Sequence, residues 1–402
     1  MVFTHLHVAS GYSARYGASL PQELARRAAE RGLDALALTD RDTVAGVVRF
    51  AKACAEAGIR PLFGVDLAVP EYTGSGYASE RRDRSAEPSE PAVRRRSPAR
   101  GGAFVDESAP RALLLARDRA GWAALCGAVT AAHTGPGPAA LDWPDLARAA
   151  SGATASNTAA PGAIASNAAA SNAIASNAAA SNTAAGGAGA GLYVLLGPGS
   201  EVGRALAAGR PDRAARLLRP WRELFGAALR LEVVHHARPG TGPGSLRLAA
   251  RTLGFAAEQG VAAVLSNDVR YADPGRGRIA DVLDAARLLV PIDGRRPTAL
   301  DGGERWLKDG TDMARLAEQV AEAAGQGRDG GRRLLAATAA VAEGCRLDPA
   351  DDLGIGRVHF PEPDQVGAGH RGADRVLRSR VTAAMVVRGH HRERRYWDRL
   401  EQ

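Results

Sequence analysis

Cysteine is scarce in this sequence of 402 residues, which contains only Cys54, Cys126 and Cys345. The three cysteines are far apart and no Cys-x-x-Cys pair occurs, so the sequence supports neither a zinc knuckle nor a redox dithiol. We therefore expect three free thiols without a chemical role.

Long apolar runs are also absent, although 45% of the residues are hydrophobic. No run of about 18 apolar residues occurs, so we expect a globular protein with no membrane span and no membrane partner. The first residues lack a basic stretch followed by an apolar segment, and we expect no signal peptide. These absences favour a cytoplasmic protein.

Lysine is nearly missing, since Lys52 and Lys308 are the only two, and arginine supplies the formal net charge of +8. Arginine forks suit phosphate oxygens better than ammonium groups do. Residues 371–402 hold nine arginines against four acidic residues, which gives +5. This basic end is typical of a surface for nucleic acid or for an acidic partner, and equally of a solvent-exposed helix face.

Strands and helices alternate near the start of the chain. Apolar runs at 2–8, 33–40 and 60–69 predict strands, with helical patterns between them. Ser19 and Gln22 form a predicted capping box at the start of the first helix. Such repeats imply parallel strands joined by crossover helices, hence an α/β fold whose chemistry lies at the carboxyl ends of the strands.

The later sequence continues this pattern around two irregular segments. Residues 73–108 are charged and rich in proline and glycine, and residues 151–191 are a low-complexity tract built on Ala-Ser-Asn-Ala-Ala, so we predict disordered insertions at both. From residue 277 onward the pattern is mainly helical. Further strands are predicted within 111–133, at 192–196, at 228–236 and at 261–271.

Two histidines flank one leucine almost at the start of the chain, at His5 and His7. Side chains alternate faces along a strand, so we expect both imidazoles to point the same way. Two imidazoles on one face indicate half of a metal site.

Five segments, in this order, resemble one known family. The whole of residues 2–291 is similar to the PHP domain (polymerase and histidinol phosphatase) at the front of C-family bacterial DNA polymerases. The nearest subgroup is that of DNA polymerase III alpha-subunit-like polymerases, replicative or error-prone. The segments that carry this resemblance are HLHVASGYSARYGAS, LALTDRDTVAGVVRFAKA, GVDLAV, LLLARDRAGWAALC and NDVRYADP.

The resemblance implies a distorted seven-stranded β/α barrel followed by a mainly helical segment. Active family members hold a three-metal cluster that hydrolyses phosphate esters, and imidazole and carboxylate ligands suit zinc or manganese. His235 competes with His236 for one ligand position. The positions that match the family's metal ligands are His5, His7, Asp40, Asp66, His236 and Asp268.

Four other ligand positions hold residues that cannot bind a metal in the family's way. Three hold Arg41, Arg111 and Arg270, and the fourth holds Tyr16. Arginine has no lone pair to donate and stays protonated. We therefore expect a vestigial site with no catalytic residue and no zinc or manganese. We also expect the three arginines to pair the carboxylates in place of the metal charge.

The resemblance divides the chain into a PHP-like domain at 1–291 and a second part at 292–402. The second part resembles the helical linker and the first, incomplete portion of the polymerase region, ending before the palm. No aspartate cluster of the kind that holds two magnesium ions for nucleotidyl transfer follows. We expect no polymerase activity from this chain alone.

Three functions remain open on the sequence. The first is the non-catalytic PHP portion of a C-family polymerase for DNA replication or repair synthesis, which meets DNA through its parent enzyme and works with polymerase or repair proteins. The second is a free-standing metal-dependent PHP phosphoesterase or 3′–5′ exonuclease. The third is a truncated or split gene product without an independent role.

Overall fold

A computed structural model describes residues 3–72, 109–135, 137–152, 191–289, 291–292, 300–358 and 372–401. The chain divides into two compact units, of which the first spans 1–154 with 187–355 and the second includes 356–402. The predicted insertions at 73–108 and 151–191 lie outside the described residues, apart from Ser151, Gly152 and Gly191. Their disorder therefore stays a prediction.

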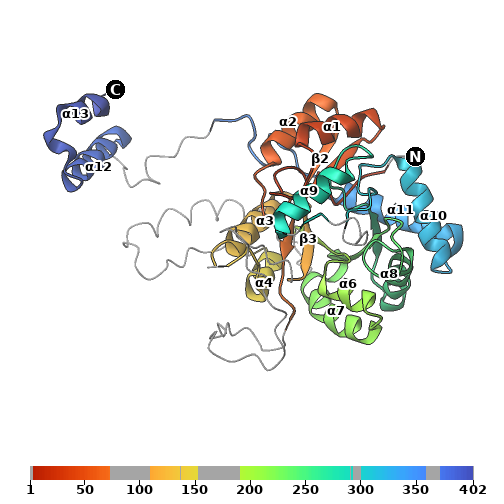
Figure 1. Ribbon diagram of the computed structural model, residues 1–402. Coiled ribbons are helices and arrows are strands. Elements are labelled where there is room, and N and C mark those ends of the chain that lie inside the picture. Colours follow the sequence, from red (N-terminus) through yellow and green to blue (C-terminus); the bar gives the residue numbers. More distant parts are fainter. Residues whose placement is uncertain are drawn as a thin grey trace. The chain divides into compact units, whose positions relative to one another are not determined.

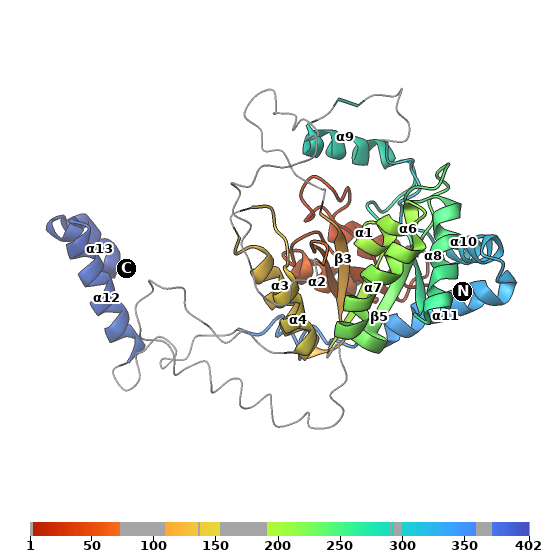
Figure 2. The ribbon, with the colours of Figure 1, turned by 90° about the horizontal axis from the view of Figure 1, so that it is seen from below.

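A curled six-stranded sheet forms the centre of the first unit, with helices around its outside (Figures 1 and 2). Its strands are fully apolar or nearly so, and β4, with sequence LYVLL, is buried at every residue. Covered sheets of this kind bury both faces of each strand. In spatial and chain order the strands are β1 (Ala35–Leu38), β2 (Arg60–Ala68), β3 (Arg111–Ala116), β4 (Leu192–Leu196), β5 (Leu229–Val234) and β6 (Ala263–Ser266).

The seventh strand of the predicted barrel is not confirmed. The N-terminal segment does lie between β1 and the chain after β6, through single bridges from His5 to Leu36 and from Val8 to Val269. It forms no ladder, because the amide of Val8 donates to the hydroxyl of Thr39 (2.8 Å) instead of to a backbone carbonyl. The α/β class and the mainly helical C-terminal part are confirmed.

The expectation of parallel strands throughout is wrong at β3, which runs antiparallel to both β2 and β4. Ala68 at the end of β2 pairs with Arg111 at the start of β3. The chain thus re-enters the sheet at the edge where it left, and an antiparallel return needs no crossover helix. One consequence is that Arg111 lies at the same edge as the carboxyl end of β2.

Helices α10 and α11 belong to the same compact unit as the sheet. Helix α11 packs on β6, and α10 packs on both α8 and α11. The domain boundary at residue 291 remains a prediction. The helices of this unit are α1 (Pro21–Glu30), α2 (Val47–Ala57), α3 (Arg119–Ala132), α4 (Trp143–Ser151), α6 (Glu201–Ala207), α7 (Pro211–Phe225), α8 (Leu246–Gln259), α9 (Gly277–Leu288), α10 (Gly310–Ala323) and α11 (Gly327–Gly344).

The predicted capping box at Ser19 is wrong. Helix α1 begins after Leu20, has no side-chain cap, and carries Pro21 at its first position, where a missing N–H costs nothing. The hydroxyl of Ser19 instead accepts a hydrogen bond from the amide of Ala272 (3.0 Å). Ser19 therefore ties α1 to the segment after β6 rather than starting the helix.

The second unit is helical where the structure describes it. It contains α12 (Ala373–Val387), a short 3-10 turn at His390–Arg392 and α13 (Arg394–Glu401). Arg378 on α12 pairs with Glu401 on α13 (2.6 Å), which holds the two helices together. Across both units, none of the described helices combines the length and the apolar character that crossing a bilayer requires.

Candidate functional site

One cavity of about 280 Å³ lies at the edge where β2, β4 and β5 end. Residues of α9 also line it, and Figure 2 shows α9 beyond one end of the strands. Charged side chains dominate the wall. The lining residues are His7, Tyr16, Arg41, Asp66, Arg111, Leu113, Leu195, Gly197, Pro198, Gly199, Glu232, Pro243, Asp268, Arg270, Asp284, Arg287 and Arg305.

The structure brings together half of the residues at metal-ligand positions. His7, Asp66 and Asp268 line the cavity, whereas His5, Asp40 and His236 do not. All three arginines expected in the cleft line it as well, namely Arg41, Arg111 and Arg270.

Asp66 is held by two guanidinium groups. The Arg111 Nε lies 3.0 Å from the Asp66 Oδ2, and the Arg41 Nε lies 3.4 Å from the same oxygen. Arg111 also pairs with Asp42 (2.9 Å). Burial alone would lower the pKa of Arg111, but the two aspartates outweigh burial and raise it above its ordinary value. The antiparallel entry of β3 thus places a permanent cation on a carboxylate in a metal-ligand position.

Asp268 is paired in the same manner, but with an arginine that the sequence did not single out. The Arg305 guanidinium lies 2.5 Å from the Asp268 Oδ2, and the His7 Nε2 lies 3.5 Å from its Oδ1. Burial raises the pKa of Asp268, but Arg305 and His7 outweigh it and hold that pKa well below its usual range. Asp268 is therefore ionised and already neutralised by protein cations.

His7 has a carboxylate at each ring nitrogen. Its Nδ1 lies 2.8 Å from the Glu232 Oε1, opposite the contact with Asp268. Burial alone would lower the pKa of His7, but Glu232 and Asp268 raise it to about 10. At neutral pH the ring is an imidazolium that donates from both nitrogens, so it has no lone pair for a metal.

Arg270 does not pair with a carboxylate in a metal-ligand position, contrary to expectation. It makes a two-pronged contact with Asp284 of α9 (2.7 and 2.8 Å) and a further one with Asp301 (3.2 Å). Its own side chain is almost wholly buried. Arg270 thus joins the segment after β6 to α9 across the cavity wall.

Tyr16, at a position where the family has an aspartate, is surrounded by guanidinium groups. The Cζ atoms of Arg41 and Arg270 lie 3.4 and 4.0 Å from its ring centroid, and those of Arg287 and Arg305 lie 5.4 Å from it. The negative face of an aromatic ring attracts such cations. The phenol oxygen also accepts a hydrogen bond from Arg305. The ring therefore gathers the arginines instead of a metal.

The two other histidines at ligand positions have structural roles. The His5 Nε2 contacts the Lys308 carbonyl (2.8 Å), and the His236 Nε2 contacts the Asn267 carbonyl (2.9 Å). Burial lowers the pKa of His5 to about 4 and, with help from Arg305, that of His236 to about 3. Both rings are neutral at pH 7 and brace the loops around the cavity. His235 does not line the cavity either.

Asp40 accepts hydrogen bonds rather than facing the cavity. Its carboxylate receives the Ser10 amide (2.6 Å), the Ser10 hydroxyl (2.9 Å) and the Ser13 hydroxyl (2.7 Å). Burial raises the pKa of Asp40, and these hydrogen bonds act in the opposite direction. Asp40 therefore shapes the turn after the N-terminal segment.

Four wall residues were missed by the sequence analysis, namely Glu232, Asp284, Arg287 and Arg305. Glu232 had a usable signal, because a lone glutamate inside the apolar strand LRLEVV needs a charged partner when buried. Its neighbour Gly197 lacks a Cβ for the same reason, since one would lie 2.0 Å from the Glu232 Oε2. The other three come from the later, helical part of the chain, and no pattern connected them to the cavity.

The donor set does not fit a metal ion. The acidic groups of the wall face guanidinium or imidazolium groups, which repel a cation. In the part of the chain that the structure describes, no three or more His, Cys, Asp or Glu side chains are grouped to hold a metal. We therefore derive no step through a metal at this site.

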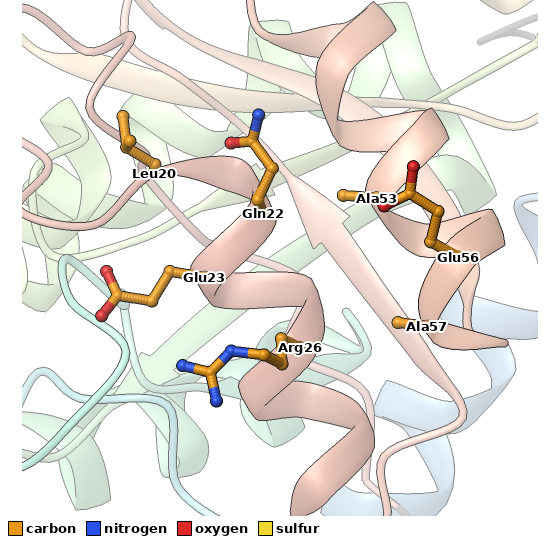
Figure 3. A pocket seen from close by; sticks show the side chains of 7 residues that line it. All are labelled: Leu20, Gln22, Glu23, Arg26, Ala53, Glu56 and Ala57. Atoms are coloured by element: carbon orange, nitrogen blue, oxygen red, sulfur yellow. The ribbon is translucent and has the colours of Figure 1, made fainter.

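A larger cavity, of about 610 Å³, lies on the outside of the barrel between α1 and α2 (Figure 3). Figure 3 shows its lining side chains rising from these two helices. Two of its charged groups are already paired, Glu23 with Arg276 (2.6 Å) and Arg26 with Glu30 (2.6 Å). It offers no cluster of groups suited to catalysis.

Known proteins match this chain as follows. The model of the PHP domain family matches residues 5–236. An error-prone DNA polymerase of Mycobacterium bovis is 29% identical over 355 residues, covering 87% of this chain and 26% of that polymerase. An error-prone DNA polymerase of Anaeromyxobacter sp. is 30% identical over 345 residues, covering 86% and 23%. This chain thus spans about a quarter of the length of these relatives.

Two further matches complete the comparison. An error-prone DNA polymerase of Corynebacterium efficiens is 51% identical over 69 residues, which cover 17% of this chain and 6% of that polymerase. Among solved structures, an amidohydrolase from Chromobacterium violaceum is 20% identical, with a TM-score of 0.32 and coverage of 66% of this chain and 87% of that one.

Proposed function

The chain belongs to the PHP domain family, and from this premise we propose that it is the PHP-containing region of a C-family DNA polymerase of the error-prone kind. The resemblance to the PHP domain that the five sequence segments indicated is confirmed. The polymerase assignment is supported by relatives of that name that match 86–87% of this chain. The proposal makes DNA its partner, through the parent enzyme, and places it in the cytoplasm, where the DNA is.

We further propose that the PHP cavity is structural and binds no zinc or manganese. One observation carries this: the two aspartates of the wall at metal-ligand positions are each held by a guanidinium, Asp66 by Arg111 (3.0 Å) and Asp268 by Arg305 (2.5 Å). A buried carboxylate without a partner is costly. The arginines supply the charge that metals supply in the family's active members, and they hold the ends of several strands together.

Metal analysis and a hydrolysis assay test the structural role. The purified chain should contain zinc and manganese far below one ion per chain, and added chelator should leave its melting temperature unchanged. It should hydrolyse neither phosphate esters nor the 3′ ends of single-stranded DNA when Mn²⁺ is added. Stoichiometric metal with chelator-sensitive hydrolysis would instead establish the free-standing phosphoesterase or exonuclease.

The polymerase assignment is tested separately, in the DNA that flanks this coding segment. That DNA should encode a C-family palm whose aspartates can hold two magnesium ions. The purified chain by itself should not extend a primed template. A genome without such a palm near this segment contradicts the assignment, whatever the state of the PHP cavity.

A further inference from the structure

We propose that the arginine-lined cavity binds a phosphate-type oxyanion, without metal and without hydrolysing it. The family's cavity for cations has become a cavity for an anion. The proposal goes beyond the polymerase assignment, because it concerns only what the wall of this cavity presents to a ligand.

The wall carries more positive than negative side chains. Its cations are the five arginines Arg41, Arg111, Arg270, Arg287 and Arg305 together with protonated His7, and its anions are Asp66, Glu232, Asp268 and Asp284. Six cations against four carboxylates leave an excess of two positive charges facing the cavity.

Sharing of carboxylates shows where this excess lies. Asp66 is shared by Arg111 and Arg41, and Asp284 is shared by Arg270 (2.7 Å) and Arg287 (2.5 Å). Two cations on one carboxylate leave the pair with a net positive charge. The same holds twice on opposite parts of the wall, once beside β2 and once on α9.

Two carboxylates behind the wall complete the cluster. Asp42 pairs with Arg111 (2.9 Å) and Asp301 with Arg270 (3.2 Å), and neither lines the cavity. The cluster is therefore neutral as a whole, but its positive groups are on the cavity side. Coulomb energy falls with distance, so the nearer charges determine the potential that a small ligand meets.

An independent sign of this positive potential comes from Arg287. Burial and then the nearby Arg41 lower the pKa of Arg287 to about 10, although Asp284 lies 2.5 Å away. The four guanidinium groups around Tyr16 crowd one side of the cavity. A bound anion would relieve this repulsion.

Size and chemistry select a phosphate group. The cavity of about 280 Å³ has room for several water molecules of ~30 Å³ each, hence for one tetrahedral oxyanion. Guanidinium forks match phosphate oxygens with paired N–H donors. The ring of Tyr16 is covered by arginines, so the wall offers no free aromatic surface for a base. The ligand is thus inorganic phosphate or a terminal phosphate of a nucleotide or a nucleic-acid end.

Thermal unfolding of the purified chain in sodium phosphate tests the proposal. Phosphate should raise the melting temperature saturably, by on the order of 5 °C at about 100 times Kd. Sodium chloride at equal ionic strength is the control. An equal rise in chloride would mean general screening and would overturn the proposal.

Two variants locate the site without leaving a carboxylate unpaired. Arg41→Gln leaves Asp66 with Arg111, and Arg287→Gln leaves Asp284 with Arg270. Each should weaken phosphate binding at least about tenfold. The matched control, Arg26→Gln, removes an exposed ion pair on α1 and should bind as the unchanged chain does. Unaltered affinity in both cavity variants rejects the site.

A measurement on the unchanged chain covers the case in which a variant does not fold. Hydrogen exchange at the amides of α9 should slow when phosphate is added, because its Arg287 contacts the ligand. Amides of α1 should not respond, and an α9 without any response contradicts the proposal.

The source of the phosphate is decided by three probes, namely inorganic phosphate, deoxyadenosine monophosphate and a 5′-phosphorylated oligonucleotide. Tighter binding of the oligonucleotide than of its unphosphorylated form identifies a nucleic-acid end, and equal binding of all three phosphates identifies the free ion. These experiments need no polymerase region. A failed polymerase assignment and a failed anion site are therefore distinguishable.

Discussion

Single arginines determine what this cavity can bind, and Arg270 is the most deeply buried of them. Its guanidinium contacts Asp284 and Asp301, and the side chain of Asp301 is fully buried. Removing one partner of a buried pair leaves an uncompensated charge. The replaced ligand positions are thus important for stability.

Arg270→Ala should lower the free energy of unfolding by about 3–5 kcal/mol, because Asp301 loses its closest cation. Urea denaturation followed by circular dichroism measures this change. Arg332→Ala is the matched control, since Arg332 and Asp329 form an ion pair with both side chains 75% exposed, and it should change stability by less than about 0.5 kcal/mol. A loss for Arg270→Ala as small as that of the control would contradict a buried pair.

His7 makes stability depend on pH in a defined direction. Its pKa rises from 6.5 to about 10 on folding, so its contribution is complete below pH 6.5 and is lost as the pH rises through about 10. The gap in unfolding free energy between the unchanged chain and His7→Gln should therefore be largest below pH 6.5 and shrink towards pH 10. Urea titrations from pH 6 to 10 measure the gap. A gap that grows with pH would show that His7 is neutral.

Restoring a metal site requires more than reversing the three replaced ligands. Arg41→His with Arg111→His supplies imidazoles, but Arg305 still holds Asp268 (2.5 Å). Adding Arg305→Ala should therefore raise zinc affinity further, because Asp268 becomes free to ligate. Calorimetric titration with zinc compares the double and the triple variant. Equal affinities would remove Arg305 from the explanation.

At the scale of elements, the sequence predicted the strands well and their directions less well. The predicted strand at 192–196 coincides with β4, because its run of five apolar residues has no other use in a covered sheet. The reversal of β3 was not predictable, because a strand reads the same in either direction. The N-terminal segment lost its ladder to the hydroxyl of Thr39, and no periodicity shows such a contact.

The site followed the same rule. Residues near the ends of predicted strands, such as Asp66, came to the cavity. The partners Arg305 and Asp284 come from the chain after β6, and only folding brings them close. Sequence spacing shows which strand end a residue occupies, and it does not show which distant side chain faces it.

Helix α3 depends on one glycine at its first turn. A Cβ on Gly121 would lie 1.6 Å from the carbonyl oxygen of Gly191, so Gly121→Ala forces the backbone apart and should lower the unfolding free energy by about 1–3 kcal/mol or more. Gly127 on the same helix has nothing within 4 Å of its Cβ position, and Gly127→Ala should stabilise by up to about 1 kcal/mol. Thermal melts compare the two. Equal effects would place Gly191 elsewhere.

At the scale of the whole molecule, the charge of +8 is unevenly placed, and residues 371–402 carry +5 of it. Their helices α12 and α13 form a unit of their own. If this unit contacts DNA, the logarithm of affinity should fall with the logarithm of salt concentration by about 0.9 for each phosphate contacted.

Deleting residues 372–402 should therefore flatten that slope by several such steps in a fluorescence-anisotropy titration with duplex DNA. Arg315→Gln with Arg332→Gln, which removes two exposed arginines from the first unit, should leave the slope nearly unchanged. A deletion that leaves the slope as it was would identify α12 and α13 as an ordinary solvated surface.

Closure of the barrel by its first residues has a consequence for synthesis on the ribosome. The amide of Ala9 bonds the carbonyl of Val269 (2.8 Å), so the nascent N-terminus meets its partner only about 260 residues later. At roughly 5–20 residues per second, translation takes roughly 13 to 52 s to reach it. During that interval His5 to Ala9 are an unpaired edge of the kind that chaperones bind and that misfolded chains share. The first residues translated are thus among the last to reach their final partners.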